Sequence, residues 1–136
     1  MKGIKYTLFL FLFAFSVIQA QEFRFKSTAL SIMQRKNSKE WGKWSTPKPT
    51  EVIISLDFNK DKIVIYSTEI QHYRIIEALG TEHTDKDVIT SYICKNVEGI
   101  VVKLSFFIRK DLDNKTQLYL YHKNFAFCYD IVEITE

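Results

Sequence analysis

Two tryptophans, Trp41 and Trp44, are the residues whose type and spacing point most directly to chemistry. They lie in a proline-containing stretch that lacks the alternation of a strand. Two indole rings in one loop can stack against a sugar ring or grip an apolar ligand. We therefore expect Trp41 and Trp44, with Tyr73 as a further aromatic contact, to bind a ligand. The alternative is that the two indoles only plug an open end of the fold.

Two acidic segments have the composition of cation sites. Asp57, Asn59 and Asp61 are spaced like the first oxygen ligands of a calcium loop. The sixth and twelfth positions of such a loop need glycine and glutamate, but here they are lysine and threonine, so a hairpin turn explains the segment better. Glu82, His83, Asp85 and Asp87 could also ligate a cation, but they belong to one loop, and we expect that loop to be solvated. We predict no metal site and no cofactor.

The sequence contains no local signature of catalysis. No Ser-His-Asp or Cys-His arrangement is recognisable, and the four glycines are isolated, so no phosphate cradle is present. His72 and His122 each stand alone in a strand-like run, which is typical of surface or rim positions. Paired carboxylates for glycoside chemistry stay open, because their spacing arises only in three dimensions. We expect no enzymatic activity and no catalytic residue, and a hydrolytic enzyme is the least favoured alternative.

Cys94 and Cys128 are the two cysteines of the chain, and they lie in separate predicted strands. In an oxidising compartment they could form one disulfide, which would close a long loop. The alternative is a pair of free, buried thiols that pack as small hydrophobic groups.

The first twenty residues have the pattern of a secretory signal peptide. Two lysines precede an apolar run of 13 residues over 6–18, and the small residue Ala20 precedes Gln21. A helix that crosses a bilayer needs about 20 apolar residues, so this run is too short for a permanent anchor. We predict that residues 1–20 are a signal peptide cleaved between Ala20 and Gln21. The protein is then secreted or periplasmic, without a stable membrane anchor after cleavage.

Composition and charge describe one folded domain over residues 21–136. A hydrophobic content of 46% and an aromatic content of 15% exclude a disordered chain. After residue 20 the chain has seventeen basic and sixteen acidic residues, for a net charge of +1. Such a balance is no electrostatic footprint for nucleic acid, and we expect no nucleic-acid partner.

Apolar and β-branched runs recur every ten to fifteen residues, with alternating faces and polar turns between them, so we predict an all-β fold. Short turns favour an antiparallel meander of about eight strands, which form a small closed or partly open barrel. A two-sheet β-sandwich is the alternative. We also expect a bulge in the first strand, a short helical turn over 38–44 and a polar loop over 80–87. The expected strands cover residues 22–35, 51–58, 62–67, 70–78, 88–95, 100–109, 116–122 and 125–133.

Four short aromatic motifs carry a family resemblance. They are Trp41-Gly-Lys-Trp44, Ile63-Val-Ile-Tyr66-Ser67, Gln71-His-Tyr73 and Gln117-Leu-Tyr119-Leu-Tyr121. Together they span most of the chain after residue 20 and are similar to a group of small, uncharacterised exported all-β proteins of Bacteroidota-type bacteria. The resemblance implies a bacterial source and a cell-envelope or secreted location. It implies no activity and no site residue.

These observations predict a non-catalytic exported binding module for a small or carbohydrate-like ligand, in the periplasm or outside the cell. The alternative is a protein-interaction module, such as an inhibitor or an envelope-assembly subunit. Apolar side chains on both faces of some strands favour that alternative, because a protein partner could cover one face. The expected partner is thus a small ligand or an envelope protein.

Overall fold

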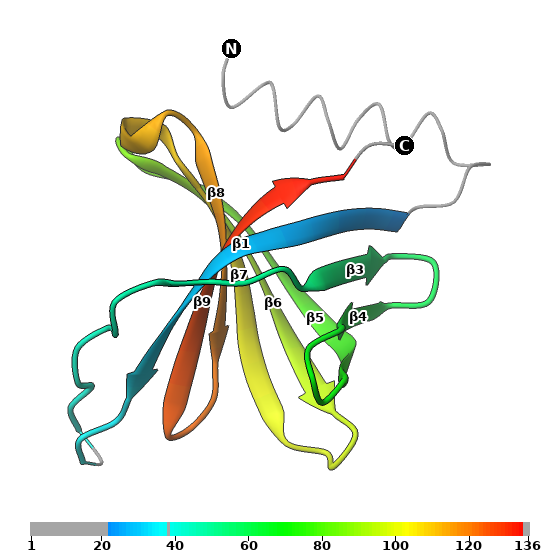
Figure 1. The fold of residues 1–136 in the computed structure, drawn as a ribbon. Helices are drawn as coiled ribbons and strands as arrows, with labels where there is room; N and C mark the ends of the chain where they lie inside the picture. Colours follow the sequence, from blue (N-terminus) through cyan, green and yellow to red (C-terminus); the bar gives the residue numbers. More distant parts are fainter. Residues whose placement is uncertain (1–21, 38, 135–136) are drawn as a thin grey trace.

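The computed structural model describes residues 22–37 and 39–134, and the predicted signal peptide over residues 1–20 lies outside the described residues. Eight antiparallel strands form one closed barrel, to which a two-residue strand is added (Figure 1). Neighbouring strands follow one another along the chain, and the first long strand pairs with the last one, which closes the sheet. The expected barrel is confirmed, and one continuous ladder excludes the two-sheet sandwich.

Each of the eight predicted strands is present, and a short 3-10 helix, η1, lies between the seventh and eighth labelled strands. Within the described residues, no helix is long and apolar enough to cross a bilayer. The elements are β1 (Glu22–Gln34), β2 (Lys48–Pro49), β3 (Ile53–Asp57), β4 (Lys62–Ile65), β5 (Gln71–His83), β6 (Asp87–Asn96), β7 (Val101–Arg109), η1 (Lys110–Leu112), β8 (Lys115–Tyr121) and β9 (Phe125–Glu133).

The long strand β1 closes the barrel because a bulge divides it. Its first half pairs with β3, and most of its length pairs with β9. The register against β9 shifts between Ser27 and Ala29, which confirms the bulge expected in this strand. Beside the shift, the Ser27 hydroxyl accepts a hydrogen bond from the Val52 backbone amide at 2.8 Å. One bent strand can therefore pair with both ends of the sheet.

Strand β5 is longer than predicted, so the expected polar loop over 80–87 is wrong for its first half. The strand continues to His83, with register shifts that leave Ile76 and Leu79 as extra residues opposite β6. Gly80 has a positive φ of 91°, a conformation that glycine adopts without strain and that lets the ladder resume after the second shift. Hydrogen bonds to β6 hold one edge of this segment, and its polar side chains face solvent, so polarity alone did not end the strand.

The helical turn expected over 38–44 is also wrong for the described residues 39–44, which contain a bend at Lys39 and no helix. The Gly42 amide donates to the Gln34 carbonyl at 2.8 Å, and the Ser45 amide donates to the Ile32 carbonyl at 2.8 Å. The free edge of β1 thus supplies the acceptors that a helix would have supplied from its own backbone.

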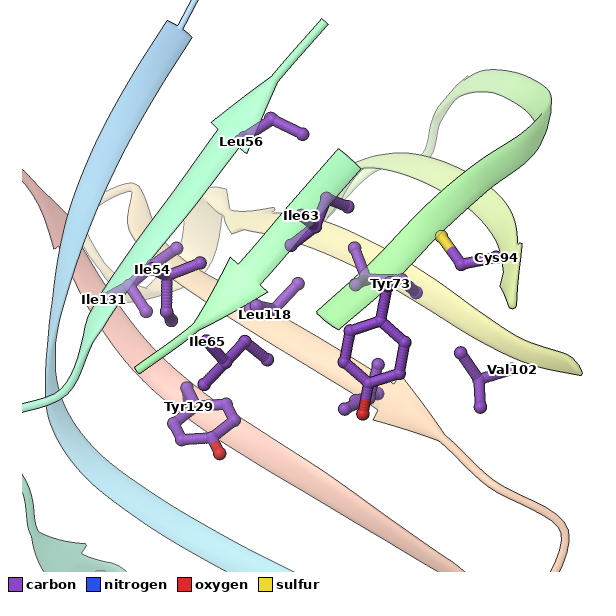
Figure 2. Close-up of a cluster of buried hydrophobic side chains, with 12 residues drawn as sticks. Ile54, Leu56, Ile63, Ile65, Tyr73, Cys94, Val102, Leu118, Tyr129 and Ile131 are labelled. Atoms are coloured by element: carbon purple, nitrogen blue, oxygen red, sulfur yellow. The ribbon is translucent and has the colours of Figure 1, made fainter. Parts of the chain in front are cut away.

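Large aliphatic and aromatic side chains fill the barrel interior (Figure 2). Ile54, Ile63 and Leu104 are among the side chains with no exposed surface. Successive residues of a strand face opposite sides, so side chains of β3 to β9 supply this core, and partly buried side chains of β1 pack against it. The interior is therefore a packed core. The buried cluster consists of Ile54, Leu56, Ile63, Ile65, Tyr73, Cys94, Val102, Leu104, Leu118, Leu120, Tyr129 and Ile131.

The two ends of the barrel differ in charge. We call one of them the basic end, because its segments carry six basic and three acidic residues. It comprises residues 35–44, 66–70, 95–100 and 122–124, and its connections lie together at the bottom of Figure 1. The opposite end carries the connections 58–61, 84–86 and 110–114.

Candidate functional site

A pocket of about 500 Å³ lies at the basic end, between the turn after β1 and the β8–β9 hairpin. Three basic side chains and two carboxamides line it: Arg35, Lys36, Asn37, Lys123 and Asn124. The two segments meet because the end of β1 pairs with the start of β9. The volume lies in the range of small-molecule sites, about 300–1,000 Å³. Cations and carboxamides together suit an anionic ligand that also carries hydroxyl groups.

Arg35 joins the two walls of this pocket. Its backbone amide donates to the Asn124 carbonyl at 2.8 Å, and its Nε donates to the Lys123 carbonyl at 2.7 Å. Its guanidinium lies 4.2 Å from the centre of the Trp41 ring, a cation–π distance. The side chain is therefore held in place before any ligand arrives.

The turn that carries Asn37 is built by the Asn37 side chain. Its carbonyl oxygen accepts hydrogen bonds from the amides of Lys39, at 2.8 Å, and Glu40, at 3.0 Å. This Asx-type turn returns the chain to β1, where Trp41 forms a bridge with Arg35. The sequence places a turn-forming residue where the pocket needs one.

The two tryptophans have separate surroundings. Trp41 is half-buried behind Arg35, beside the pocket, so a ligand contact at Trp41 stays a prediction. Trp44 is 37% exposed and meets Tyr119 edge-on at 5.6 Å. Tyr119 lies between two core residues of β8 and so faces outward, which places Trp44 on the outer wall of the barrel. The indoles form no common platform, and Trp44 does not plug the barrel end.

Tyr73, the third expected contact residue, lies inside the barrel and is 4% exposed. Its hydroxyl donates to Gln71 Oε1 at 2.8 Å and lies 3.4 Å from His122 Nε2. Burial raises the pKa of Tyr73, so the hydroxyl stays protonated. Figure 2 shows the hydroxyls of Tyr73 and Tyr129 on the same side of the core. Tyr73 is thus a core residue, and the structure does not bring it together with the tryptophans.

His122 precedes the pocket residue Lys123 and lies at the barrel rim, as its position in a strand-like run suggests. Its ring stacks on Phe125 with centroids 4.3 Å apart and an interplanar angle of 16°. Burial lowers the pKa of His122, so the imidazole is neutral at pH 7. This stack supports the hairpin that carries Lys123.

The possible disulfide is not formed, because Cys94 and Cys128 are both free and buried. Cys94 belongs to the interior cluster, whereas Cys128 directly precedes the interior residue Tyr129 and so faces the other side of the sheet. The wall of the barrel separates the two thiols. Burial raises the pKa of each thiol to about 11, so both are protonated at neutral pH.

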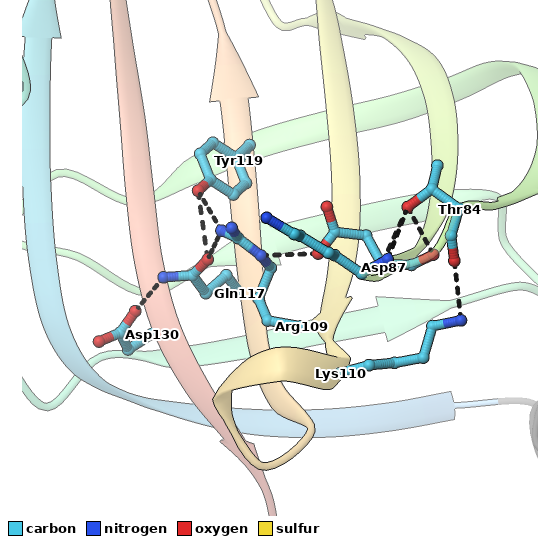
Figure 3. Close-up of polar contacts among 8 residues, drawn as sticks. Thr84, Asp87, Arg109, Lys110, Gln117, Tyr119 and Asp130 are labelled. Carbon is cyan, nitrogen blue, oxygen red and sulfur yellow. Dashed lines mark hydrogen bonds and ion pairs between the residues drawn. The ribbon is translucent and has the colours of Figure 1, made fainter.

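A row of polar side chains crosses the outer wall from β6 to β9 (Figure 3). Arg109 Nε lies 2.7 Å from Asp87 Oδ1 as an ion pair without hydrogen-bond alignment, and Arg109 Nη1 donates to Gln117 Oε1 at 3.1 Å. Gln117 Nε2 donates to Asp130 Oδ1 at 2.8 Å. Asp87 is therefore ion-paired, although the sequence placed it in a solvated loop. Among the described residues, no group of three or more His, Cys, Asp or Glu could hold a metal ion.

No family model, curated protein or solved structure matches this chain. The resemblance to exported Bacteroidota-type proteins therefore stays a prediction. The pocket residues were missed at the sequence level because Arg35 and Lys123 are distant in the chain. Only the pairing of β1 with β9 brings them together.

Proposed function

We propose that this chain is a non-catalytic exported binding module that holds an anionic, sugar-sized ligand in the pocket at the basic end. The observation that carries the proposal is the convergence of Arg35, Lys36 and Lys123 with two carboxamides on one pocket. The cations would hold a carboxylate, sulfate or phosphate group, and the Asn124 carboxamide would exchange hydrogen bonds with hydroxyls, because the Asn37 side chain is engaged in its own turn.

The fixed guanidinium of Arg35 supports this proposal. A side chain already held by Trp41 and the Lys123 carbonyl loses little freedom when a ligand binds. Arginine presents several N–H donors in a planar fork, a geometry that matches carboxylate and sulfate oxygens. Trp41, on the other side of the guanidinium, gives the pocket an aromatic reporter.

The packed interior also favours the barrel end as the binding place. Leu118 and Leu120 are fully buried in the centre, so a ligand there would have to displace core side chains. Each displaced side chain would lose about 1.5–3 kcal/mol of burial free energy. A ligand at the rim avoids that cost.

The environment of the two cysteines and of His122 disfavours thiol catalysis. The thiolate is the reactive form of cysteine, and burial raises the pKa of Cys94 and Cys128 to about 11. His122 is neutral, and its Nε2 lies near a tyrosine hydroxyl whose pKa burial also raises.

A fluorescence titration tests the proposal. The parent for it is Trp44→Phe, which leaves Trp41 as the single indole, because the chain has two tryptophans. We expect a disaccharide that contains glucuronic acid to change the Trp41 emission, whereas a neutral glucose disaccharide does not. Lys123→Gln should weaken the affinity for the uronate disaccharide about fivefold, the effect of losing one charge-assisted contact of about 1 kcal/mol.

Lys86→Gln is the matched control, because Lys86 is an exposed lysine at the opposite end of the barrel. It should leave the uronate affinity unchanged, and added salt should weaken binding in both proteins. Equal binding of the neutral and acidic sugars, or no effect of Lys123→Gln, would contradict the proposal. Intact mass of the exported protein would test the proposed cleavage between Ala20 and Gln21.

A second candidate, a protein-interaction module, is favoured by the outer half of β5. Of the described strands, only β6 pairs with residues 76–83, because β4 pairs with β5 only as far as Arg74. Ile76 and Leu79 on this segment are 45% and 46% exposed. An extended segment of a partner could add to such an edge. Native mass spectrometry of the protein from its host should then show a heteromer that Leu79→Glu disrupts.

A further inference from the structure

Two neighbouring connections at the basic end expose apolar side chains at their tips. Tyr66 and Ile70 in the β4–β5 connection are 47% and 54% exposed. The exposed fractions are 80% for Val97 and 47% for Ile100 in the β6–β7 connection, and 55% for Val101, the first residue of β7. The two connections are adjacent because β5 pairs with β6. We call these five residues the apolar tips.

The turn itself does not require an apolar residue at Val97. Asn96 Oδ1 accepts hydrogen bonds from the amides of Glu98 and Ile100, both at 2.9 Å, and Gly99 supplies the positive φ of 83°. These contacts define the hairpin without the valine side chain. A polar residue would serve the turn equally well, so the exposed valine calls for another reason.

The apolar tips share their barrel end with an excess of positive charge. The remaining segments of the chain after residue 20 carry eleven basic and thirteen acidic residues. The connections of the opposite end carry three basic and four acidic residues, so the two ends of a nearly neutral protein differ in charge, and the apolar tips lie at the positive one. The charged residues of the basic end are Arg35, Lys36, Lys39, Lys43, Lys95 and Lys123, against Glu40, Glu69 and Glu98.

Apolar and basic residues occupy different arcs of the same rim. The apolar tips lie on the connections that flank β5 and β6, and most of the basic residues lie on the turn after β1 and the β8–β9 hairpin. All four connections project in the same direction in Figure 1. A single plane brought against this end could therefore touch both arcs at once.

We propose that the basic end docks reversibly on an anionic lipid bilayer. The apolar tips enter the boundary between headgroups and acyl chains, and the basic arc contacts the anionic headgroups. Charge complementarity favours a lipid surface over a neutral partner. Separate projecting tips can each enter a fluid bilayer, whereas a protein partner would need a matching hollow for every tip. This inference does not depend on a sugar-sized ligand in the pocket.

Vesicle flotation tests this inference with the chain from residue 21 to residue 136, which contains every described strand and the whole core. Vesicles of phosphatidylcholine with added phosphatidylglycerol should bind the protein, and vesicles of phosphatidylcholine alone should bind it far less. The double variant Ile70→Ser/Val97→Ser should lower the partition coefficient roughly tenfold or more, because it removes several buried methylene groups. Added salt should also lower it.

The matched control is Ile76→Ser/Leu79→Ser, which removes two similarly exposed apolar side chains from β5, outside the basic end. It should leave the partition coefficient unchanged. Three results would overturn the inference. They are absence of binding to either vesicle, equal binding to both vesicle types, and binding that the Ile70→Ser/Val97→Ser variant leaves intact. A concentration-dependent dimer that this variant abolishes would assign the apolar tips to a second copy and would also overturn it.

Discussion

Leu118→Ala tests whether the barrel interior is a packed core, on which the location of the proposed ligand depends. Leu118 is packed among the other residues of the core cluster and has no solvent-exposed surface. The substitution removes three carbon atoms, which lose about 2.4 kcal/mol of transfer free energy at about 0.8 kcal/mol per group. A rigid barrel wall relaxes little, so a cavity term adds to this loss. We expect the free energy of unfolding to fall by about 3–4 kcal/mol.

Urea denaturation followed by tryptophan emission and circular dichroism measures this change. Leu79→Ala, at a position that is 46% exposed on β5, serves as the control and should cost less than about 0.5 kcal/mol. A loss below about 1 kcal/mol for Leu118→Ala would refute the reasoning, because it would mean that the interior tolerates empty space. The proposed ligand could then lie inside the barrel.

Three further predictions follow from the buried polar groups. Neither Cys94 nor Cys128 should react with iodoacetamide at pH 7 until the chain unfolds, and both should then react without a reductant. Mass spectrometry measures the added mass, and an unfolded chain that stays unmodified would indicate a disulfide. Arg109→Met should cost about 1–3 kcal/mol in urea denaturation, because it leaves Asp87 unpaired at 18% side-chain exposure, and adding Asp87→Asn should cost less than the sum of the single changes. Burial lowers the pKa of His122 below its ordinary 6.5, so the unfolded chain binds a proton first as the pH falls, and the free energy of unfolding should decrease below about pH 6.5. A His122→Gln variant should lose that part of the pH dependence, and identical pH profiles of the two proteins would contradict the assignment.

The alternating rows predicted most of the barrel and also contained an unused indication about the cysteines. Phe127, Tyr129 and Ile131 form one row of β9, so Cys128, at the intervening parity, faces the other side of the sheet. Cys94 lies inside, in the core cluster. Parity therefore argued against a disulfide once one face of each strand was assigned to the core. A buried-looking position does not say on which side of a sheet the residue is buried.

Tyr73 and Trp44 show where composition misleads. Both are aromatic and near other aromatics in the sequence, but Tyr73 completes the interior, and Trp44 covers part of the outer wall against Tyr119. Aromatic side chains bury large areas in either place, so residue type does not distinguish a ligand contact from a packing contact.

By itself, the sequence determined the strands, their hairpin order and the side chains that face the core. These features depend on a period of two and on turn residues a few positions apart, so they are local. The tertiary structure decided the closure of β1 on β9, the continuation of β5 beyond Gly80 and the pocket between Arg35 and Lys123. Each of these depends on hydrogen bonds or contacts between strands, and the partner in such a contact is set by the whole sheet.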